Sequence, residues 1–484
     1  MSKPEPAPPE SQIKQLFQEH FHTEATACHA LPPSGSNRRY FRLEGGGRTV
    51  IGVVNSHVAE NNSYFYFTEL FRKHQIRVPE VYAISKDRQC YLQQDLGSQS
   101  LFDKLMADGY TDEVKNLFSQ SLHQLAKLQW IAGSEADFSQ CYGLRRFDEK
   151  TIMADLLYFK FYFADLQPVV YDRNLLMEEL EEVSKELGRQ QPPVLMFRDF
   201  QSRNILLHEG EVWFIDFQGA MQGPPQYDVA SLLWQARAQL PAAWRDELLN
   251  HYLQAHKDVG ASRVNEVHFR NGYLRMVLLR LLQVLGAYGF RGLLEQKPHF
   301  LASIAPALEN LHVFLNDYPQ QPAYPELRRL LERLSSEEVR SAFQPFQKPE
   351  NSNLQITVCS FSYKQGLPSD ESGHGGGYVF DCRGILNPGR YEAYKRLSGK
   401  DQPVIHFLEQ QTKMPEFLNH VRALVSVNVE DYLSRGFEHL SIAFGCTGGQ
   451  HRSVYAATKI AAYLQQQYGL SVQLRHLNEE RWVR

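Results

Sequence analysis

The alternation of apolar and polar positions predicts a small, β-rich lobe near the start of the chain. From residue 11 to residue 97, short apolar segments such as "RRYFRLE", "RTVIGVVN" and "VPEVYAI" are separated by turn residues. Segments of this length with such boundaries are typical of β-strands. One stretch, "SYFYFTELFRKHQ", has the period of a helix. Residues 1–10 are polar and rich in proline, which predicts a disordered tail.

Residues 98–333 have a different pattern, which predicts a helical lobe. Stretches such as "DEVKNLFSQSLHQLAKLQWIAG" repeat apolar residues at three- and four-residue spacing, as a helix with one buried face does. One β-like segment, "VLMFRDFQSRNILLHEGEVWFIDF", interrupts these helices. The most apolar run begins at Tyr273 and contains Arg275 and Arg280, so it predicts a buried helix and not a membrane span.

The last part of the chain predicts a separate α/β domain. Residues 334–353 are polar and include two prolines, which is the composition of an interdomain linker. From residue 354 to residue 484, strand-like and helix-like segments alternate, as in "LQITVCSFSY", "GGYVFDCR" and "HLSIAFGC" with the helix after it. Such alternation is typical of α/β folds.

Composition limits the classes of protein to which the chain can belong. At 484 residues it is too long for one ordinary core, so two or three domains are expected. The net charge of -4 argues against a strong electrostatic grip on nucleic acid. Six cysteines without paired spacing fit reduced thiols better than a disulfide framework or a zinc site. No apolar signal segment begins the chain, so we expect a soluble, cytoplasmic protein without membrane partners.

The β-like segment of the helical lobe carries residues suited to phosphoryl transfer. Asp199 and Asn204 form an R-D-x-x-x-x-N loop, and Asp216 follows in a strand ending in I-D-F. Phosphoryl transfer needs a carboxylate to orient and deprotonate the attacking hydroxyl, and oxygen ligands for magnesium. The alternative is two surface loops in which Asp and Asn only form turns.

Residues 11–333 resemble the aminoglycoside phosphotransferase/choline kinase superfamily. The narrower resemblance is to the anomeric sugar kinases that phosphorylate N-acetylmuramate and N-acetylglucosamine, through "SGSNRRYFRL", "QQDLGSQSL", "RDFQSRNIL" and "IDFQGAMQGPPQYDVASLLWQAR". It implies an α+β, protein-kinase-like two-lobe domain that uses ATP and Mg2+. Asp199 would be the catalytic base, Asn204 and Asp216 the magnesium ligands, and Asp228 a buried support of the catalytic loop. The resemblance assigns the nucleotide phosphates to Ser34, Gly35, Ser36 and Asn37, and the adenine hinge to Gln93 and Asp95.

Two departures from the family pattern matter for the site. Phe197 begins the catalytic loop, where many kinases have His, and the strand "RTVIGVVN" has no lysine to hold the nucleotide phosphates. Arg39, or alternatively Arg38, is the candidate replacement cation, with Glu69 on the small-lobe helix as its partner. Arg binds phosphate as a planar fork and Lys as a point charge, so the geometry must differ. A non-catalytic kinase fold is therefore the alternative for this lobe pair.

Residues 354–484 resemble the C-terminal domain of RapZ, a bacterial RNase adapter that senses amino-sugar phosphate. The resemblance rests on "CSFSYKQGLPSD", "YVFDCRGILNPGRY" and "FGCTGGQHRSVYAA", while the P-loop of the RapZ family is missing. It implies a smaller α/β domain that binds a hexosamine phosphate or UDP-N-acetylglucosamine. Backbone amides at a strand-to-helix turn, with a nearby Arg, suit such an anion. The candidate ligand-binding residues are Ser362, Lys364, Asp381, Arg383, Cys446, Thr447, Gly448, Gly449, His451, Arg452 and Ser453.

Two other interpretations of this glycine loop remain open. The run from Cys446 to Ser453 also satisfies C-x5-R-S, the loop of cysteine phosphatases, in which a thiolate attacks phosphorus. Gly445 stands where those enzymes have His, and no acidic loop is evident. The third interpretation is a structural turn. RNA binding is less supported, because the tail "RHLNEERWVR" mixes acidic with basic residues.

Together these features predict an enzyme with a sensor domain. It would phosphorylate an amino sugar at the anomeric hydroxyl in cell-wall sugar salvage, and its C-terminal domain would bind an amino-sugar phosphate or a nucleotide sugar. The alternative is a non-catalytic regulatory adapter that binds RNA or protein partners in response to such metabolites. No spacing pattern identifies the sugar, for which Tyr158, Tyr162 and Arg237 are candidate contacts.

Overall fold

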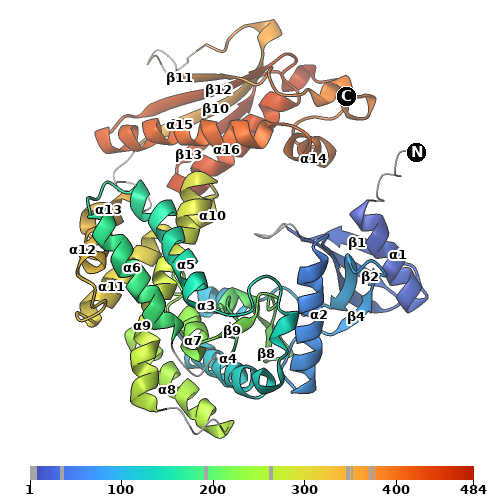
Figure 1. Ribbon diagram of the computed structural model, residues 1–484. Coiled ribbons are helices and arrows are strands. Elements are labelled where there is room, and N and C mark those ends of the chain that lie inside the picture. The colour runs from blue at the N-terminus through green and yellow to red at the C-terminus, as the bar shows by residue number, and fades with distance from the viewer. Residues whose placement is uncertain are drawn as a thin grey trace. The chain divides into compact units, whose positions relative to one another are not determined.

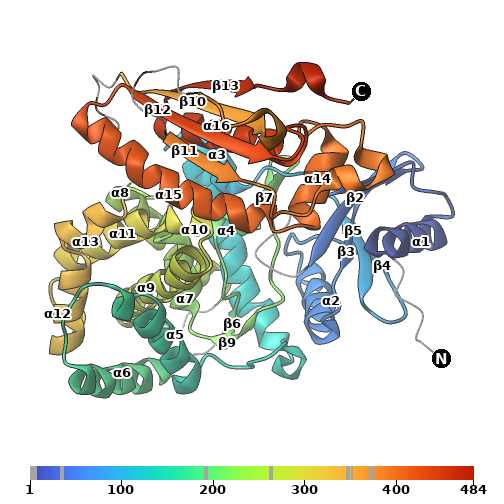
Figure 2. The same cartoon turned by 90° about the horizontal axis from the view of Figure 1, so that it is seen from above.

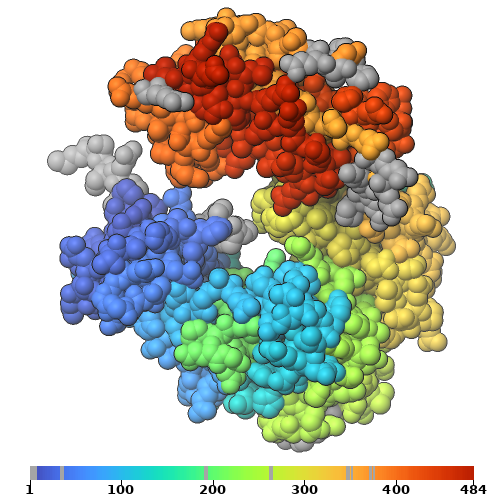
Figure 3. Space-filling view, turned by 180° about the vertical axis from the view of Figure 1, so that it is seen from behind, coloured from blue at the N-terminus to red at the C-terminus, as the bar shows by residue number. Residues whose placement is uncertain are grey.

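The chain forms two compact units, Met1–Gln344 and Pro345–Arg484. The computed structural model describes residues 8–32, 38–189, 194–260, 265–344, 353–369 and 377–483, together with Pro349 and Gly373 (Figure 1). The first unit consists of a β-rich lobe and a helical lobe, which lie side by side in the space-filling view of Figure 3.

The small lobe is a five-stranded antiparallel sheet between two helices. Alternation along the strands sends Phe41, Leu43 and Leu92 to one face, where they pack with Ile13 and Phe17. Ile51, Val53 and Tyr91 join the main core on the other face. The sheet order is β1-β2-β3-β5-β4. The elements are α1 (Pro9–Phe21), β1 (Ala27–Ala30), β2 (Arg39–Gly45), β3 (Arg48–Val54), α2 (Val58–Lys73), β4 (Val81–Ile84) and β5 (Cys90–Gln94).

One prediction for this lobe was wrong. The sequence pattern predicted a single helix here and a disordered tail up to residue 10, whereas α1 begins at Pro9. Proline fits the first turn of a helix because the amide it lacks would have no partner there. Ile13, Leu16 and Phe17 are buried, so this helix covers a sheet face that would otherwise meet water. Residues 1–7 of the predicted tail lie outside the described part of the chain.

The large lobe is helical, as predicted, with two short antiparallel strand pairs that carry the catalytic segment. β6 (Val194–Met196) pairs with β9 (Met221–Gly223), and β7 (Ile205–His208) pairs with β8 (Glu211–Phe214). The helices are α3 (Leu101–Asp108), α4 (Asp112–Trp130), α5 (Glu149–Tyr162), α6 (Arg173–Gly188), α7 (Pro225–Leu233), α8 (Ala242–Asp258), α9 (Glu266–Tyr288), α10 (Pro298–Leu301), α11 (Ile304–Asp317), α12 (Pro325–Leu334) and α13 (Glu337–Ala342).

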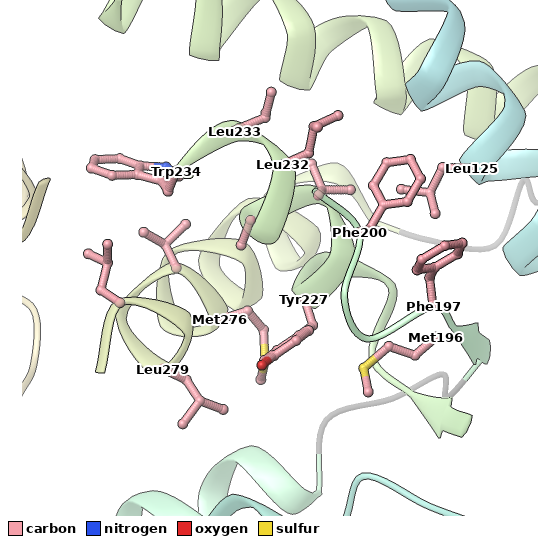
Figure 4. Packing of buried hydrophobic residues seen from close by; sticks show 14 of the residues in the cluster. Leu125, Met196, Phe197, Phe200, Tyr227, Leu232, Leu233, Trp234, Met276 and Leu279 are labelled. Atoms are coloured by element: carbon pink, nitrogen blue, oxygen red, sulfur yellow. The ribbon is translucent and has the colours of Figure 1, made fainter. Parts of the chain in front are cut away.

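Helix α9 is the centre of the large lobe. Within the described residues, one helical stretch, Glu266–Leu294, has the length and hydropathy of a membrane span, and 56% of its most apolar window is buried inside the protein. Glycines let α5 approach it closely, since a Cβ at Gly289 would lie 2.0 Å from the Tyr162 carbonyl oxygen. Met276 of α9 packs beside Tyr227, and the same core contains Leu279 of α9 and the catalytic-loop residue Phe197 (Figure 4).

The predicted boundary between the lobe and the linker also needs correction. Residues 334–353 were predicted to be a linker, yet α13 occupies Glu337–Ala342 and Val339 is buried in the main core. The division between the two units follows Gln344. A single buried apolar residue in a short polar segment is too weak a signal to indicate a helix from sequence.

The C-terminal unit is a four-stranded parallel sheet in the order β11-β12-β10-β13 (Figure 2). Three helices bury apolar residues against one face of it, in a core separate from that of the first unit. The fourth strand, β13, was not predicted, because its residues are mostly polar. The elements are β10 (Gln355–Ser362), β11 (Gly377–Asp381), α14 (Gln402–Gln410), α15 (Met414–Arg435), β12 (His439–Cys446), α16 (Arg452–Tyr468) and β13 (Ser471–His476).

Candidate functional site

The catalytic loop connects β6 to β7 and brings Asp199 next to Asn204. The Asn204 side-chain amide donates to the Asp199 carbonyl oxygen at 2.9 Å. The Ile215 amide donates to the Asn204 carbonyl oxygen at 3.0 Å, so the loop is tied to the segment that carries Asp216. Asp216 has a φ of 66°, a conformation that costs a non-glycine residue energy and that clusters at functional sites.

A cavity of about 410 Å³ lies between the two lobes next to these residues. Asn204 and Asp216 line it from the large lobe, and Gln93 and Asp95 line it from the small lobe, as the resemblance implied. Tyr64 donates its hydroxyl to the Gln93 side chain at 2.8 Å. Ser34–Asn37, expected over the phosphates, lie outside the described residues.

Asp95 takes part in the hinge in a way that the sequence did not indicate. Its carboxylate accepts from Arg42 Nε at 2.6 Å and from Arg42 NH2 at 3.0 Å. It also accepts from the Gly97 amide at 2.9 Å. Asp95 therefore fixes the connection between the lobes, because three of its acceptor sites are already used by the protein.

Of the two candidate arginines, Arg38 faces the cavity and Arg39 does not. Successive residues of a strand point to opposite faces of a sheet, so Arg38 shares the cavity face with Tyr40 and Arg42. Arg39 is exposed on the opposite side. Arg38 is only 6% exposed, and its guanidinium lies 3.5 Å from Asp216. One residue of register decides which of the two guanidinium groups reaches the cavity.

The partner of this cation is Glu60 and not Glu69. Arg38 NH2 donates to Glu60 Oε1 at 2.6 Å. Asn55 holds the second oxygen of the same carboxylate at 2.8 Å. Glu69 is exposed farther along α2 and lines a different cavity, with Arg72 and Lys73. Glu60 lies in the first turn of α2, where the helix dipole also favours a carboxylate.

Asp228 supports the catalytic loop, as predicted. It is fully buried, and its two oxygens accept the amides of Phe197 at 2.8 Å and Arg198 at 2.9 Å. The Gln129 side chain is a third donor at 2.9 Å. Burial raises the pKa of Asp228 to about 7, although these donors act in the opposite direction. Phe197 itself braces the loop by packing against Phe200 and Phe214, where a His would use hydrogen bonds (Figure 4).

The buried Arg280 contacts the Asp199 carboxylate, and the partly buried Arg198 precedes Asp199 in the chain. Arg280 NH2 lies 3.5 Å from Asp199 Oδ1, and Arg280 NH1 donates to the Tyr227 hydroxyl at 3.2 Å. Arg198 donates to both oxygens of Asp155 at 3.0 and 3.1 Å. The Asp199 side chain remains 52% exposed, so it is accessible to an incoming group. Arg280 was not predicted as a site residue. In the sequence it appears only as a charged residue within an apolar helix.

Oxygen ligands that fit magnesium line the same cavity. In the described part of the chain, no group of three or more His, Cys, Asp and Glu side chains could hold a metal. Asp216 and Asn204 instead share the cavity with Gln218, whose amide nitrogen donates to Asp216 Oδ1 at 2.8 Å. Gln218 Oε1 is buried and has no hydrogen-bond partner among the described residues. Carboxylate and amide oxygens are the ligands that Mg2+ prefers, so the residues present fit the ion.

In the C-terminal unit the predicted residues meet at one edge of the sheet. Ser362, Asp381 and Cys446 end three neighbouring parallel strands, where ligand crevices of α/β sheets lie. Ser362 donates its hydroxyl to the Thr447 carbonyl oxygen at 2.8 Å. Thr447 and Gly448 are exposed, directly before the 17-residue helix α16. The open part of the loop is therefore these two residues.

Arg452 and His451 have structural roles that the sequence did not indicate. Arg452 is 4% exposed, and its NH1 donates to the carbonyl oxygens of Arg383 at 2.9 Å and Ile385 at 2.7 Å. His451 Nε2 lies 2.9 Å from the Tyr394 carbonyl oxygen. Carbonyl groups therefore occupy NH1, whereas the buried Nε has no hydrogen-bond partner among the described residues, and the expected contact of Arg452 with a phosphate stays a prediction.

Exposed charges near the loop come from other residues. The Arg383 side chain is 49% exposed, pairs with Asp381 at 2.7 Å, and lies 3.8 Å from the centre of the Tyr363 ring. Lys364 is exposed, and its amide donates to the Ser362 hydroxyl at 3.3 Å. The side chains of Arg383 and Lys364 therefore lie at the strand ends and are exposed to solvent.

The thiol of Cys446 is buried. It is 3% exposed, and its sulfur lies 3.1 Å from the hydroxyl oxygen of Ser453. A nucleophilic cysteine must reach its substrate, so this placement argues against the phosphatase interpretation.

The C-terminal tail belongs to the framework of the loop. Asn478 accepts the Ser362 amide at 2.7 Å, and the Trp482 indole donates to the Gly449 carbonyl oxygen at 2.9 Å. From sequence this tail was only an RNA-binding candidate, since nothing in its composition indicates contacts with a loop about 30 residues away in the chain.

Comparison with known proteins assigns each unit to a fold. Residues 28–262 match the model of the phosphotransferase enzyme family, and residues 354–480 match the RapZ C-terminal domain. The predicted fold class is thereby confirmed: a kinase-like phosphotransferase fold in the N-terminal region, and a RapZ-type α/β domain after it.

Similar proteins and structures each correspond to one part of the chain. A nucleotide-binding protein of Dinoroseobacter shibae is 41% identical over 128 residues, which is 26% of this chain and 41% of that protein. One of Endomicrobium trichonymphae is 38% identical over 112 residues, 23% of this chain and 37% of its own. The chain thus spans about two fifths of the length of these curated relatives. The crystal structure of choline kinase LicA from Streptococcus pneumoniae has a TM-score of 0.42 and 13% identity, covering 62% of this chain and 99% of its own.

Replacing Asp228 by Asn should loosen the catalytic loop. The Asn side chain has one acceptor oxygen for two loop amides, so one buried donor loses its partner at a cost of about 1–3 kcal/mol. We expect faster hydrogen–deuterium exchange at residues 194–204 and a lower melting temperature. Asp258→Asn, at an exposed position on α8, is the matched control and should behave as the unmodified protein. Unchanged exchange in Asp228→Asn would contradict the supporting role.

Proposed function

We propose that Met1–Gln344 is an ATP- and Mg2+-dependent cytoplasmic kinase that phosphorylates an amino sugar at its anomeric hydroxyl. N-acetylmuramate and N-acetylglucosamine are the expected acceptors, in cell-wall sugar salvage. The observation that carries the proposal is the exposed Asp199 carboxylate on the same short loop as Asn204, beside Asp216 at the cavity between the lobes. This complete set argues against a non-catalytic adapter, which would have no use for it.

The cavity suits a nucleotide in both shape and chemistry. Ile51 and Tyr91 of the small lobe and Leu206 and Ile215 of the large lobe supply apolar walls for a planar base. At the other end, Arg38 supplies a positive charge held in place by Glu60. Such a fork matches the geometry of phosphate oxygens.

Asn204, Asp216 and Gln218 would hold the magnesium ion through their oxygens. When bound, the ion neutralises negative charge on the nucleotide phosphates during transfer. The side-chain amide nitrogen of Gln218 orients the Asp216 carboxylate. The Ser63 hydroxyl donates to the main-chain carbonyl oxygen of Gln218 at 2.9 Å. Helix α2 of the small lobe thereby helps to position Gln218, a proposed metal ligand in the large lobe.

Asp199 would accept the proton of the acceptor hydroxyl. Its carboxylate is exposed toward solvent on one side and held by Arg280 on the other. The Arg280 guanidinium, 3.5 Å from Oδ1, would fix the orientation of the Asp199 carboxylate, and Asp228 fixes the loop behind it. The amino-sugar ring would lie against Tyr158, Tyr162 and Phe290, three aromatic residues whose ring centres lie 4.9–6.0 Å apart.

The C-terminal domain would bind a hexosamine phosphate or UDP-N-acetylglucosamine at the exposed Thr447–Gly448 loop. Amides at the start of α16 point toward that loop, and the dipole of the 17-residue helix favours an anion there. Arg383 and Lys364 would supply exposed charged contacts. A product or precursor of the kinase reaction bound here would report on the sugar pool.

Asp199→Asn should abolish most of the kinase activity without preventing nucleotide binding. Loss of the general base lowers turnover by about 10²–10⁴-fold, and Asp199 does not line the nucleotide cavity. The measurement is ADP release with ATP, Mg2+ and a panel of amino sugars, combined with calorimetric binding of ATP. Asp258→Asn is again the control. Turnover at the level of the unmodified protein in Asp199→Asn would refute a kinase at this site.

Arg38→Gln should raise the KM for ATP, whereas Arg39→Gln should not. Removal of a charge-assisted contact costs about 1.5–3 kcal/mol, which corresponds to an increase of roughly ten- to a hundredfold. The two neighbouring positions are a matched pair on opposite faces of one strand, and Glu60→Gln with Glu69→Gln is a second pair. Thermal melts separate misfolding from weak binding. The reverse ranking of either pair would contradict the proposed geometry.

Gly448→Val should block metabolite binding to the C-terminal domain without unfolding it. A Cβ at Gly448 meets no atom within 4 Å, so the backbone tolerates a side chain that would cover the loop amides. We expect calorimetric binding of glucosamine phosphate or UDP-N-acetylglucosamine to weaken at least about tenfold. Ala462→Val, exposed on α16, and Cys446→Ser are controls that should retain affinity. Hydrolysis of p-nitrophenyl phosphate that disappears in Cys446→Ser would instead establish the phosphatase interpretation.

A further inference from the structure

Two arginines at the catalytic loop have no acidic partner among the residues that the structure describes. Arg203 directly precedes Asn204, and Arg237 follows helix α7; both are exposed. Arg198 and Arg280, the other two arginines of this region, are paired with Asp155 and Asp199. Within the described ranges, neither Arg203 nor Arg237 forms an ion pair with a carboxylate. The region around Asp199 therefore carries excess positive charge.

Hydrogen bonds hold the segments of these two arginines together. The amide and the hydroxyl of Ser202 both donate to Gln235 Oε1, at 3.0 and 2.7 Å. Ser202 is adjacent to Arg203, and Gln235 lies two residues before Arg237. The Arg237 guanidinium lies 5.5 Å from the centre of the Phe102 ring on α3, which itself packs against the turn that contains Arg203.

The same positive charges affect the pKa values of two groups, one on α9 and one on α10. Burial raises the pKa of Tyr288, at the end of α9, while Arg203, Arg280 and Arg237 act in the opposite direction. Burial also lowers the pKa of His299 on α10, and Lys297, Arg203 and Arg237 lower it further. At neutral pH, His299 is therefore uncharged and supplies no additional repulsion.

We infer that Arg203 and Arg237 form an anion subsite for the acceptor, so that the preferred sugar carries a carboxylate or a phosphate besides the hydroxyl that reacts. Ser202 and Gln235 join the two segments that carry these like charges, and an anion that contacts both arginines would remove the repulsion between them. The planar fork of Arg suits both carboxylate and phosphate oxygens. The inference rests on the proposed kinase function, because it assigns the acceptor to the Asp199 side of the loop.

Three acceptors that differ in charge test this subsite. N-acetylglucosamine is neutral, N-acetylmuramate adds a carboxylate to the same ring, and the 6-phosphate of N-acetylglucosamine adds a phosphate. We expect the full-length protein to favour one charged acceptor by at least about tenfold in kcat/KM, and which one it is identifies the anion. Calorimetry with each acceptor measures binding independently of turnover.

Variants that remove one charge test whether the preference for a charged acceptor depends on Arg203 and Arg237. Arg203→Gln and Arg237→Gln should each raise the KM for the charged acceptor about tenfold or more, with kcat, and both constants for the neutral acceptor, near those of the unmodified protein. Arg270→Gln is the matched control, since it removes an exposed charge from α9 at its ion pair with Glu266. Equal kcat/KM for neutral and charged acceptors, or variants that weaken both alike, would overturn the inference.

The same experiment separates failure of the subsite from failure of the kinase. If no sugar is phosphorylated, the proposed function fails and calorimetry decides the subsite. Binding of a charged sugar that disappears in Arg203→Gln and Arg237→Gln would still support an anion subsite. Equal affinity of the unmodified protein for all three sugars would refute it.

Discussion

The pair of hydrogen bonds from the Phe197 and Arg198 amides to the buried Asp228 carboxylate underlies the whole candidate site. A fully buried carboxylate is unfavourable unless several donors surround it, and here three N–H groups do so. Those bonds fix the start of the catalytic loop. Asp199 and Asn204 follow within a few residues, so their positions depend on this anchor. Helix α7, which carries Asp228, therefore positions the loop although it contributes no group to the cavity between the lobes.

An ion pair and a hydrogen bond connect the two lobes, in addition to apolar packing. Arg38 from the small lobe lies near Asp216 from the large lobe, and the Ser63 hydroxyl of α2 holds the Gln218 carbonyl oxygen. Arg38, the proposed phosphate cation, and the proposed metal ligands are therefore parts of one network. A change in α2 alters the cavity from both sides, because Glu60 and Ser63 lie in the same helix.

In the C-terminal domain, much of the conspicuous loop serves the fold. Arg452 and His451 bind main-chain carbonyl groups, and Cys446 is buried beside Ser453. The residues that look most reactive in the sequence thus hold the loop in shape. What they leave accessible is the Thr447–Gly448 backbone at the start of a long helix. An anion site of this kind depends on amide direction and helix dipole more than on side-chain identity.

The sequence alone determined the two-unit organisation and the spacing of Asp199, Asn204 and Asp216, because periodicity and short loops are local properties. The resemblance of its motifs to a kinase family indicated the kinase-like fold class. It also indicated the buried role of Asp228. Only the tertiary structure distinguished Arg38 from Arg39 and Glu60 from Glu69, since strand register and helix rotation depend on contacts between distant segments. The same holds for Arg280, the Gln218 main chain and the Trp482 tail, whose partners Asp199, Ser63 and Gly449 lie far away in the chain. Local sequence patterns do not identify partners that are distant in the chain.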